Sequence, residues 1–60
     1  MQLTQRDIVI KKLLDAQEMV RDYEQFSKEI KDEEIANTFK SFAEESGMQA
    51  QKLQGMLDRI

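Results

Sequence analysis

Apolar residues recur in the first half of the chain at alternating intervals of four and three, the repeat of a packed helix face. This seam comprises Val9, Leu13, Ala16, Val20, Tyr23, Ser27 and Ile30. Met19 and Phe26 widen one flank of the seam, and Ile10 widens the other. The pattern predicts an amphipathic helix over residues 4–30.

The second half of the chain carries a seam with the same spacing. Its members are Ile35, Phe39, Phe42, Ser46, Gln49, Leu53, Met56 and Ile60. A neighbouring stripe of mostly small residues comprises Ala36, Ala43, Gly47, Ala50 and Leu57. Small residues let another helix approach closely, and a mid-helix glycine such as Gly47 costs about 1 kcal/mol relative to alanine. The pattern predicts a helix over residues 33–59 with one large apolar face and one small face.

Local signals mark the starts of both helices. Thr4, followed by Asp7 three residues later, resembles a capping box. Asp32 is a favourable N-cap, and Glu33 and Glu34 then fall in the first turn, where the helix dipole favours acidic side chains. These signals predict two separate helices with a break near residue 31.

A continuous helix is the alternative, because the chain has no proline and no glycine near residue 31. A lone rod of this length needs a more regular seam than Ala16 and Ser27 provide. We therefore predict an all-α fold in which residues 1–60 form one domain, an antiparallel two-helix hairpin.

The chain is too short to rely on one core. It has 60 residues, and below roughly 70–80 residues a core seldom supplies more than about 3–5 kcal/mol. The absence of cysteine excludes disulfides and thiolate metal sites, and the absence of histidine removes the commonest neutral metal ligand. Oligomerisation is the remaining way to stabilise so short a chain, so we expect a homodimer that forms a four-helix bundle. Parallel and antiparallel docking of the two hairpins are both open.

Polar residues interrupt the seam of the second helix at Ser46 and Gln49. Tyr23 is expected a turn or two away, with its hydroxyl bonded to one of them. We interpret the three as a polar core layer that fixes register or oligomeric state, in which Gln49 bonds to Gln49 or Ser46 of the partner subunit. A small polar ligand pocket is the alternative. The predicted oligomer interface comprises Ala36, Phe39, Phe42, Ala43, Gly47, Ala50 and Leu53.

The framework residues resemble the second half of a ferritin-like or rubrerythrin-like helical hairpin. The matching positions are Tyr23-Glu24-Gln25-Phe26, Ile35-Ala36, Phe39, Ala43, Ala50 and Leu53, and the resemblance extends over residues 13–57. Hairpins of that family carry a glutamate on the first helix and Glu-x-x-His on the second, and they bind two metals inside a four-helix bundle. The resemblance therefore implies the same architecture for this chain.

The metal-ligand positions of that family are replaced in this chain. In the register set by the framework residues, the resemblance puts the first-helix glutamate at Ala16 and the Glu-x-x-His pair at Ser46 and Gln49. These side chains bind iron or manganese poorly, so no metal and no cofactor are expected. The acidic residues that remain as candidates are expected on the solvated surface, and they are Glu18, Glu24, Glu44 and Glu45.

We predict a non-catalytic structural or protein-interaction module, a ferritin-like hairpin without a metal site. Its expected partner is a second copy of itself, and another protein is the alternative. Two other functions stay open. One is a rubrerythrin-like metal-binding or redox protein with unrecognised carboxylate ligands. The other is a spore-coat-like structural protein, suggested by Thr4-Gln5-Arg6-Asp7-Ile8 followed by Leu13-Leu14.

Charge and hydropathy exclude several other classes. The net charge is −3, with 9 basic and 12 acidic residues intermixed, so no basic patch indicates nucleic acid and no basic helix face indicates a membrane surface. Nucleophilic catalysis is not expected, because a histidine-free hairpin offers a serine neither a base nor an oxyanion hole. No apolar run predicts a signal peptide or a transmembrane span, so we expect a cytoplasmic protein.

Overall fold

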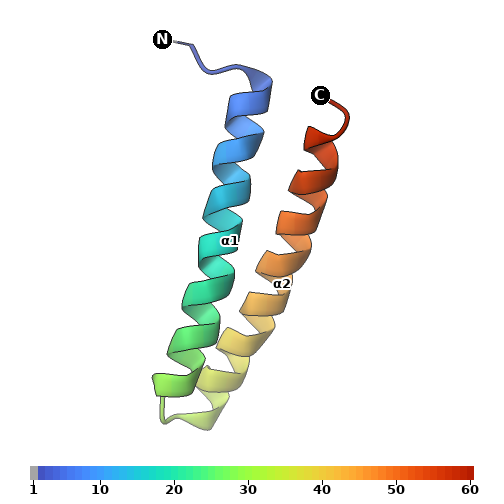
Figure 1. Ribbon diagram of the computed structural model, residues 1–60. Coiled ribbons are helices and arrows are strands. Elements are labelled where there is room, and N and C mark those ends of the chain that lie inside the picture. Colours follow the sequence, from blue (N-terminus) through green and yellow to red (C-terminus); the bar gives the residue numbers. More distant parts are fainter. Residues whose placement is uncertain (1) are drawn as a thin grey trace.

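The computed structural model describes residues 2–60, which form two helices and no strand. Helix α1 spans Gln5–Glu29 and helix α2 spans Glu33–Leu57. The helices run side by side in opposite directions, with the described ends of the chain at one end and the connecting loop at the other (Figure 1). The prediction of an all-helical chain with two helices is confirmed, and both helices are slightly shorter than predicted.

Both predicted N-caps are present. Thr4 Oγ1 accepts a hydrogen bond from the Asp7 backbone N–H at 3.1 Å, and the Asp7 carboxylate accepts one from the Thr4 N–H at 3.0 Å. At the start of α2, the Asp32 carboxylate accepts a hydrogen bond from the Ile35 N–H at 2.9 Å. These bonds satisfy amide groups that would otherwise lack a partner in the first turn of each helix.

The loop between the helices is made without glycine. Ile30 ends α1 in an extended conformation, with φ −78° and ψ 127°, and its N–H donates to the Phe26 carbonyl at 3.0 Å. Asp32 is also extended, with φ −68° and ψ 120°, and no described residue has a positive φ. The chain therefore reverses direction through extended residues, where Ile30 ends α1 and Asp32 caps the start of α2.

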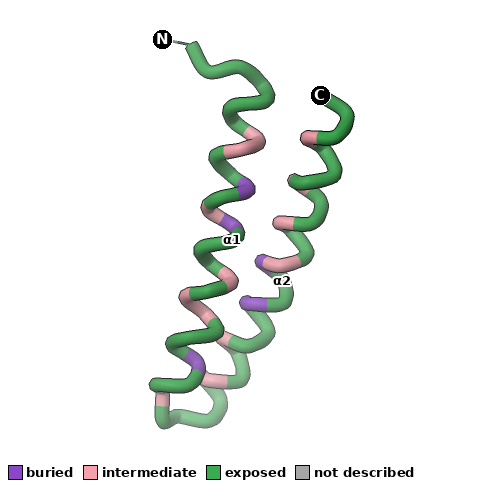
Figure 2. The backbone as a smooth tube through the Cα atoms, in the orientation of Figure 1, coloured by how far each residue is buried: buried purple, intermediate pink, exposed green. Residues whose placement is uncertain are grey.

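Few residues are buried between the helices. Those that are buried are Leu13, Ala16 and Ser27 of α1 and Ala43 and Ser46 of α2 (Figure 2). Among residues 2–60, no large side chain is completely buried. Two helices can cover each other only along one stripe, and small side chains on that stripe bury little apolar area. The core of a single hairpin is therefore small.

Helix α1 turns its predicted seam toward α2, since every seam residue from Val9 to Ile30 is buried or half-buried. Helix α2 presents a different set of residues to α1. That set is Ala36, Phe39, Ala43, Ser46, Ala50, Leu53 and Leu57. The predicted seam of α2 is therefore partly wrong, because Ile35, Phe42, Gln49 and Met56 are exposed. Alanine or serine at four of these seven positions lets the two helices of one chain pack closely, and the large residues Ile35, Phe42 and Met56 remain outside.

A long-range contact closes the end of the hairpin that carries the termini. Arg6 Nη1 donates hydrogen bonds to the carbonyl oxygens of Leu57 at 3.2 Å and Ile60 at 3.3 Å. The last carbonyl groups of a helix lack intrahelical partners and carry the negative end of its dipole. Arg6 therefore links the first turn of α1 to the end of α2 with the favourable sign of charge.

Candidate interaction surface

One side of the hairpin carries large apolar side chains that neither helix covers. On α2, the exposed residues Ile35, Phe42 and Met56 belong to a row with a spacing of seven, and Gln49 completes that row. On α1, the exposed residues Met19 and Phe26 have the same spacing. Residues seven apart lie on one stripe of a helix. We call this set the apolar face, and its members are Met19, Phe26, Ile35, Phe42, Gln49 and Met56.

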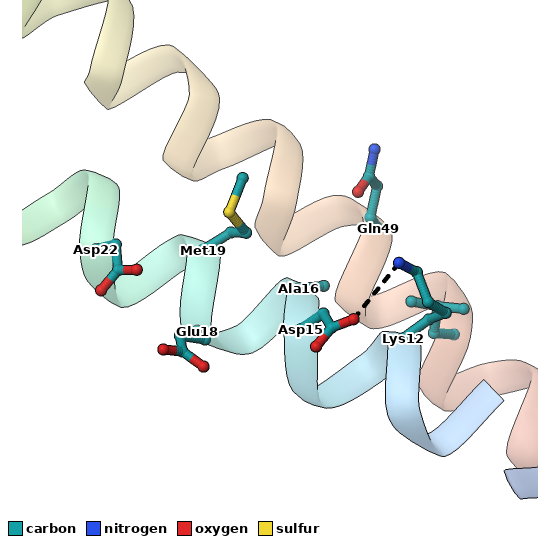
Figure 3. A pocket seen from close by; sticks show the side chains of 8 residues that line it. Lys12, Asp15, Ala16, Glu18, Met19, Asp22 and Gln49 are labelled. Atoms are coloured by element: carbon teal, nitrogen blue, oxygen red, sulfur yellow. Dashed lines mark ion pairs between the residues drawn. The ribbon is translucent and has the colours of Figure 1, made fainter. Parts of the chain in front are cut away.

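The two rows lie on the same side of the hairpin. Residues of both helices line one groove there, namely Lys12, Asp15, Ala16, Glu18, Met19, Asp22, Gln49 and Leu53. In Figure 3, Met19 of α1 and Gln49 of α2 extend to the same side of the helix pair. The row of α1 and the row of α2 therefore form one continuous surface across both helices.

The opposite side of the hairpin differs in composition. Gly47 and Gln49 are two residues apart, which separates them by about 200° around α2. Lys40 and Gln54 lie seven residues before and after Gly47, on the same stripe. A Cβ added to Gly47 would meet Val20 Cγ2 at 4.0 Å, an ordinary van der Waals distance. The α2 stripe on this side is therefore polar, although α1 carries the exposed Leu14 there, and the glycine is not forced by close contact within the hairpin.

An aromatic cluster joins the helix contact to the apolar face. The Tyr23 ring lies edge-on to Phe39, with centroids 5.3 Å apart and an interplanar angle of 70°. It lies edge-on to Phe42 as well, at 5.4 Å and 62°. Phe39 is half-buried and Phe42 is 38% exposed, so the cluster runs from inside the hairpin to its surface. Such edge-to-face contacts add to the free energy of burial.

The three residues of the predicted polar layer do not lie together. Ser46 is buried at the helix contact and Tyr23 is half-buried, but Gln49 is exposed. The contacts recorded for Tyr23 are with the rings of Phe39 and Phe42. Gln49 is exposed because it belongs to the row of Phe42 and Met56, which lies to one side of the buried stripe. The structure therefore brings Tyr23 and Ser46 to the contact between the helices and leaves Gln49 at the surface.

Most residues of the predicted oligomer interface face α1 of the same chain. Ala43 is buried, and Ala36, Phe39, Ala50 and Leu53 are half-buried. These residues lie on the stripe of α2 that faces α1. Gly47 lies beside Val20 on the polar side, and Phe42 alone belongs to the apolar face.

Sequence reasoning missed that Ile35 and Met56, together with Met19 and Phe26, form an exposed surface. The signal that identifies them is the spacing of seven between large apolar residues outside the stripe of alanines. Once that stripe is assigned to the helix contact, the row beside it must be exposed.

Charged residues border the groove on α1. Lys11 Nζ donates to Asp15 Oδ2 at 3.1 Å, and Lys12 Nζ lies 3.4 Å from the same oxygen. The hydrogen bond from Lys11, with a smaller contribution from Lys12, lowers the pKa of Asp15 below its ordinary value. All three side chains are largely exposed, so the ion pairs contribute little to stability within the hairpin.

Within residues 2–60, no three His, Cys, Asp or Glu side chains group closely enough to hold a metal ion. Of the three residues that the resemblance to ferritin-like hairpins assigns to ligand positions, Ala16 and Ser46 are buried and Gln49 is exposed. Neither described helix is long and apolar enough to cross a membrane.

Comparison with protein-family models, curated proteins and solved structures finds no match to this chain. The resemblance to ferritin-like hairpins therefore rests on the framework residues alone and stays a prediction.

Proposed function

We propose that the protein is a non-catalytic interaction module that self-associates through the apolar face into a homodimeric four-helix bundle. On this proposal, the chain is a ferritin-like hairpin that has kept the bundle framework without the metal ligands. The observation that supports it is the contrast between the two surfaces of α2. Four of the seven α2 residues that face α1 are alanine or serine, whereas three of the four residues in the exposed row beside them are large and apolar.

The energetics of the hairpin support association. Burial of apolar area contributes roughly 25 cal/mol per Å², and among residues 2–60 of one chain the buried apolar residues are only Leu13, Ala16 and Ala43. Phe26, Phe42 and Met56 are 44%, 38% and 38% exposed. A second hairpin that covers these side chains supplies the apolar burial that one chain lacks.

The dimensions of the hairpin suit such an interface. The Cα atoms extend over 43 × 23 × 12 Å, so the broad side of the helix pair measures 43 by 23 Å. A stable interface of standard size buries roughly 800 Å² on each partner. One broad side therefore offers enough area for a stable dimer without any further domain.

Two matched methionine substitutions test the proposal. Met56→Gln changes a residue of the apolar face, whereas Met48→Gln changes an outward residue of α2 that is 65% exposed. Sedimentation velocity should show that Met56→Gln raises the dimer dissociation constant by roughly tenfold or more, because each dimer loses two partly buried side chains. Met48→Gln should leave the constant unchanged.

The control variant makes the experiment decisive. Equal dissociation constants for both variants and for the wild-type protein would show that the chain associates through another surface. A wild-type protein that sediments as a folded monomer at every concentration would overturn self-association itself.

A further inference from the structure

The middle of α1 and the C-terminal half of α2 lie at the same height in the hairpin. Ala16 and Gln49 line one groove and lie near each other across it (Figure 3). Residue 17, next to Ala16, is also the midpoint of α1, which spans Gln5–Glu29. A twofold axis at this height, perpendicular to the helices, would place α1 of a second copy along the whole length of α1.

We propose that two copies of the chain dock through the apolar face with their loops at opposite ends of the bundle, on a twofold axis at the height of Ala16 and Gln49. This inference rests on the self-association proposed above and adds the orientation of the two hairpins. The alternative is docking with both loops at one end, where the axis runs along the bundle and α1 lies on α2 of the partner. Opposite-end docking instead places α1 on α1 and α2 on α2.

The α2 row of the apolar face is symmetric about Gln49. Phe42 and Met56 lie seven residues on either side of it, so the twofold axis places Phe42 on the partner's Met56. Gln49 then meets the partner's Gln49, and two primary amides can each donate and accept a hydrogen bond. In same-end docking, Gln49 faces the height of the partner's Ala16, which has no hydrogen-bonding side chain.

Pairs of α1 residues lie at equal distances on either side of the proposed axis. Phe26 and Ile8 lie nine residues on either side of residue 17, and Lys12 and Asp22 lie five residues on either side. Lys12 and Asp22 line the groove, and Ile8 is half exposed and lies seven residues before Asp15, another lining residue. Because a helix rises a constant 1.5 Å per residue, the axis places Phe26 on the partner's Ile8 and Lys12 beside the partner's Asp22.

The charges next to Gln49 also pair in opposite-end docking. Glu45 lies four residues before Gln49 and Lys52 lies three residues after it, both on the outer side of the row. The twofold axis therefore brings Glu45 to the partner's Lys52, and the same pair forms a second time by symmetry. Opposite charges at an interface select one orientation over another even where they add little affinity.

Same-end docking brings like charges together. There α1 lies on the partner's α2 at equal height, so Asp22 approaches the partner's Glu45 and Lys12 approaches the partner's Lys52. Asp15 also approaches Lys52 in that arrangement, but Asp15 already pairs with two lysines of its own chain. Opposite-end docking brings Glu18 near the partner's Asp15, but Asp15 is already paired with two lysines of its own chain. Like-charge contacts across an interface disfavour an orientation, so the remaining charges favour opposite-end docking.

Spin labels measure the orientation directly, because the chain has no cysteine and a single introduced cysteine is the only label site. In the Lys31→Cys variant, the label lies in the loop. Pulsed dipolar spectroscopy should give a distance close to the 43 Å length of the hairpin for opposite-end docking. A distance at or below its 23 Å width would show same-end docking and overturn the inference.

A second label separates failure of the orientation from failure of association. The Glu18→Cys label lines the groove near the middle of α1 in both arrangements, so it gives a short distance across any dimer that docks through this face. A short distance from both labels overturns opposite-end docking alone. No dipolar signal from either label, together with a monomer mass, overturns the self-association on which the inference rests.

A charge exchange provides an independent test. Glu45→Lys should raise the dimer dissociation constant several-fold, because it replaces two opposite-charge contacts with repulsive ones. The double variant Glu45→Lys with Lys52→Glu should restore the wild-type constant. Tighter association of the Glu45→Lys single variant would contradict the inference, because same-end docking predicts relief of the repulsion from Asp22.

Discussion

The Tyr23 ring stands edge-on to the Phe42 ring, with centroids 5.4 Å apart and an interplanar angle of 62°. Tyr23 belongs to the seam of α1 that faces α2, whereas Phe42 belongs to the exposed row of α2. The contact therefore couples packing within one chain to the surface that we assign to a second chain. Changes to the aromatic cluster should affect folding and association to different degrees.

The first prediction compares two phenylalanines of that cluster. Phe39→Ala should lower the melting temperature at every protein concentration, because Phe39 packs on Tyr23 within the hairpin. A fully buried phenylalanine costs about 3–5 kcal/mol on truncation, and the half-buried Phe39 should cost less. Phe42→Ala should mainly raise the dimer dissociation constant and steepen the dependence of melting on concentration. Circular dichroism melts over a wide concentration range distinguish the two effects.

The opposite pattern would contradict the assignment of these residues. If Phe42→Ala lowered stability equally at all concentrations while Phe39→Ala weakened association, Phe39 would belong to the interface between chains.

The second prediction concerns the two glycines of α2. Gly47→Ala and Gly55→Ala should each stabilise the protein by up to about 1 kcal/mol, because alanine is the better helix former. A Cβ at Gly47 meets Val20 at an ordinary 4.0 Å, and a Cβ at Gly55 has no neighbour within 4 Å. Chemical denaturation measures both changes. Loss of dimer in Gly47→Ala alone would show that a partner helix packs on Gly47, on the side opposite the apolar face.

The third prediction concerns the N-cap of α1. Thr4→Ala removes the hydroxyl that accepts from the Asp7 N–H, and it should cost about 1 kcal/mol. Thr38→Ala is the matched control, since the Thr38 hydroxyl only donates to the Glu34 carbonyl inside a helix. Urea titration should show a lower midpoint for Thr4→Ala and no loss for Thr38→Ala. Equal midpoints for the two variants would mean that the capping box contributes no stability.

The fourth prediction concerns acid stability. The Thr4 backbone N–H, followed by the Thr4 hydroxyl and Arg6, lowers the pKa of Asp7, and Lys11 chiefly lowers the pKa of Asp15. A folded-state pKa below the unfolded value stabilises the protein when the carboxylate is ionised. This stabilisation is complete above the ordinary value of 3.8 and declines as pH falls through the lower folded values.

Thermal melts over an acidic pH series measure this effect. The melting temperature should fall below pH 3.8 in the wild-type protein and fall less in Asp7→Asn, which cannot lose that charge. Identical acid dependence in both proteins would show that Asp7 contributes nothing to it.

Much of the fold follows from local patterns in the sequence. The alternation of four and three identifies the α1 residues that face α2, from Val9 to Ile30. The caps at Thr4 and Asp32 appear where the sequence predicts them, because a short polar side chain before a helix has a specific hydrogen-bonding role. These features depend only on neighbours within one helix.

The choice between the two stripes of α2 does not follow from local patterns. Both the row from Ile35 to Met56 and the stripe from Ala36 to Leu57 repeat with helical spacing. Hydrophobicity favours the first row, but close packing against the small α1 residues Ala16 and Ser27 favours the second. The sequence predicts Gln49 in a buried layer because it belongs to the more hydrophobic row. Its exposure follows from the packing of the other stripe against α1.

The mass of the protein in solution tests self-association most directly. Native mass spectrometry of the untagged chain, purified without chelator and measured before and after addition of ferrous iron, gives oligomeric state and bound metal together. We predict a particle of twice the 7.1 kDa chain mass in both measurements, with no added metal. A folded particle of 7.1 kDa at all concentrations would contradict the dimer, and a dimer that gains two iron masses would contradict the absence of a metal site.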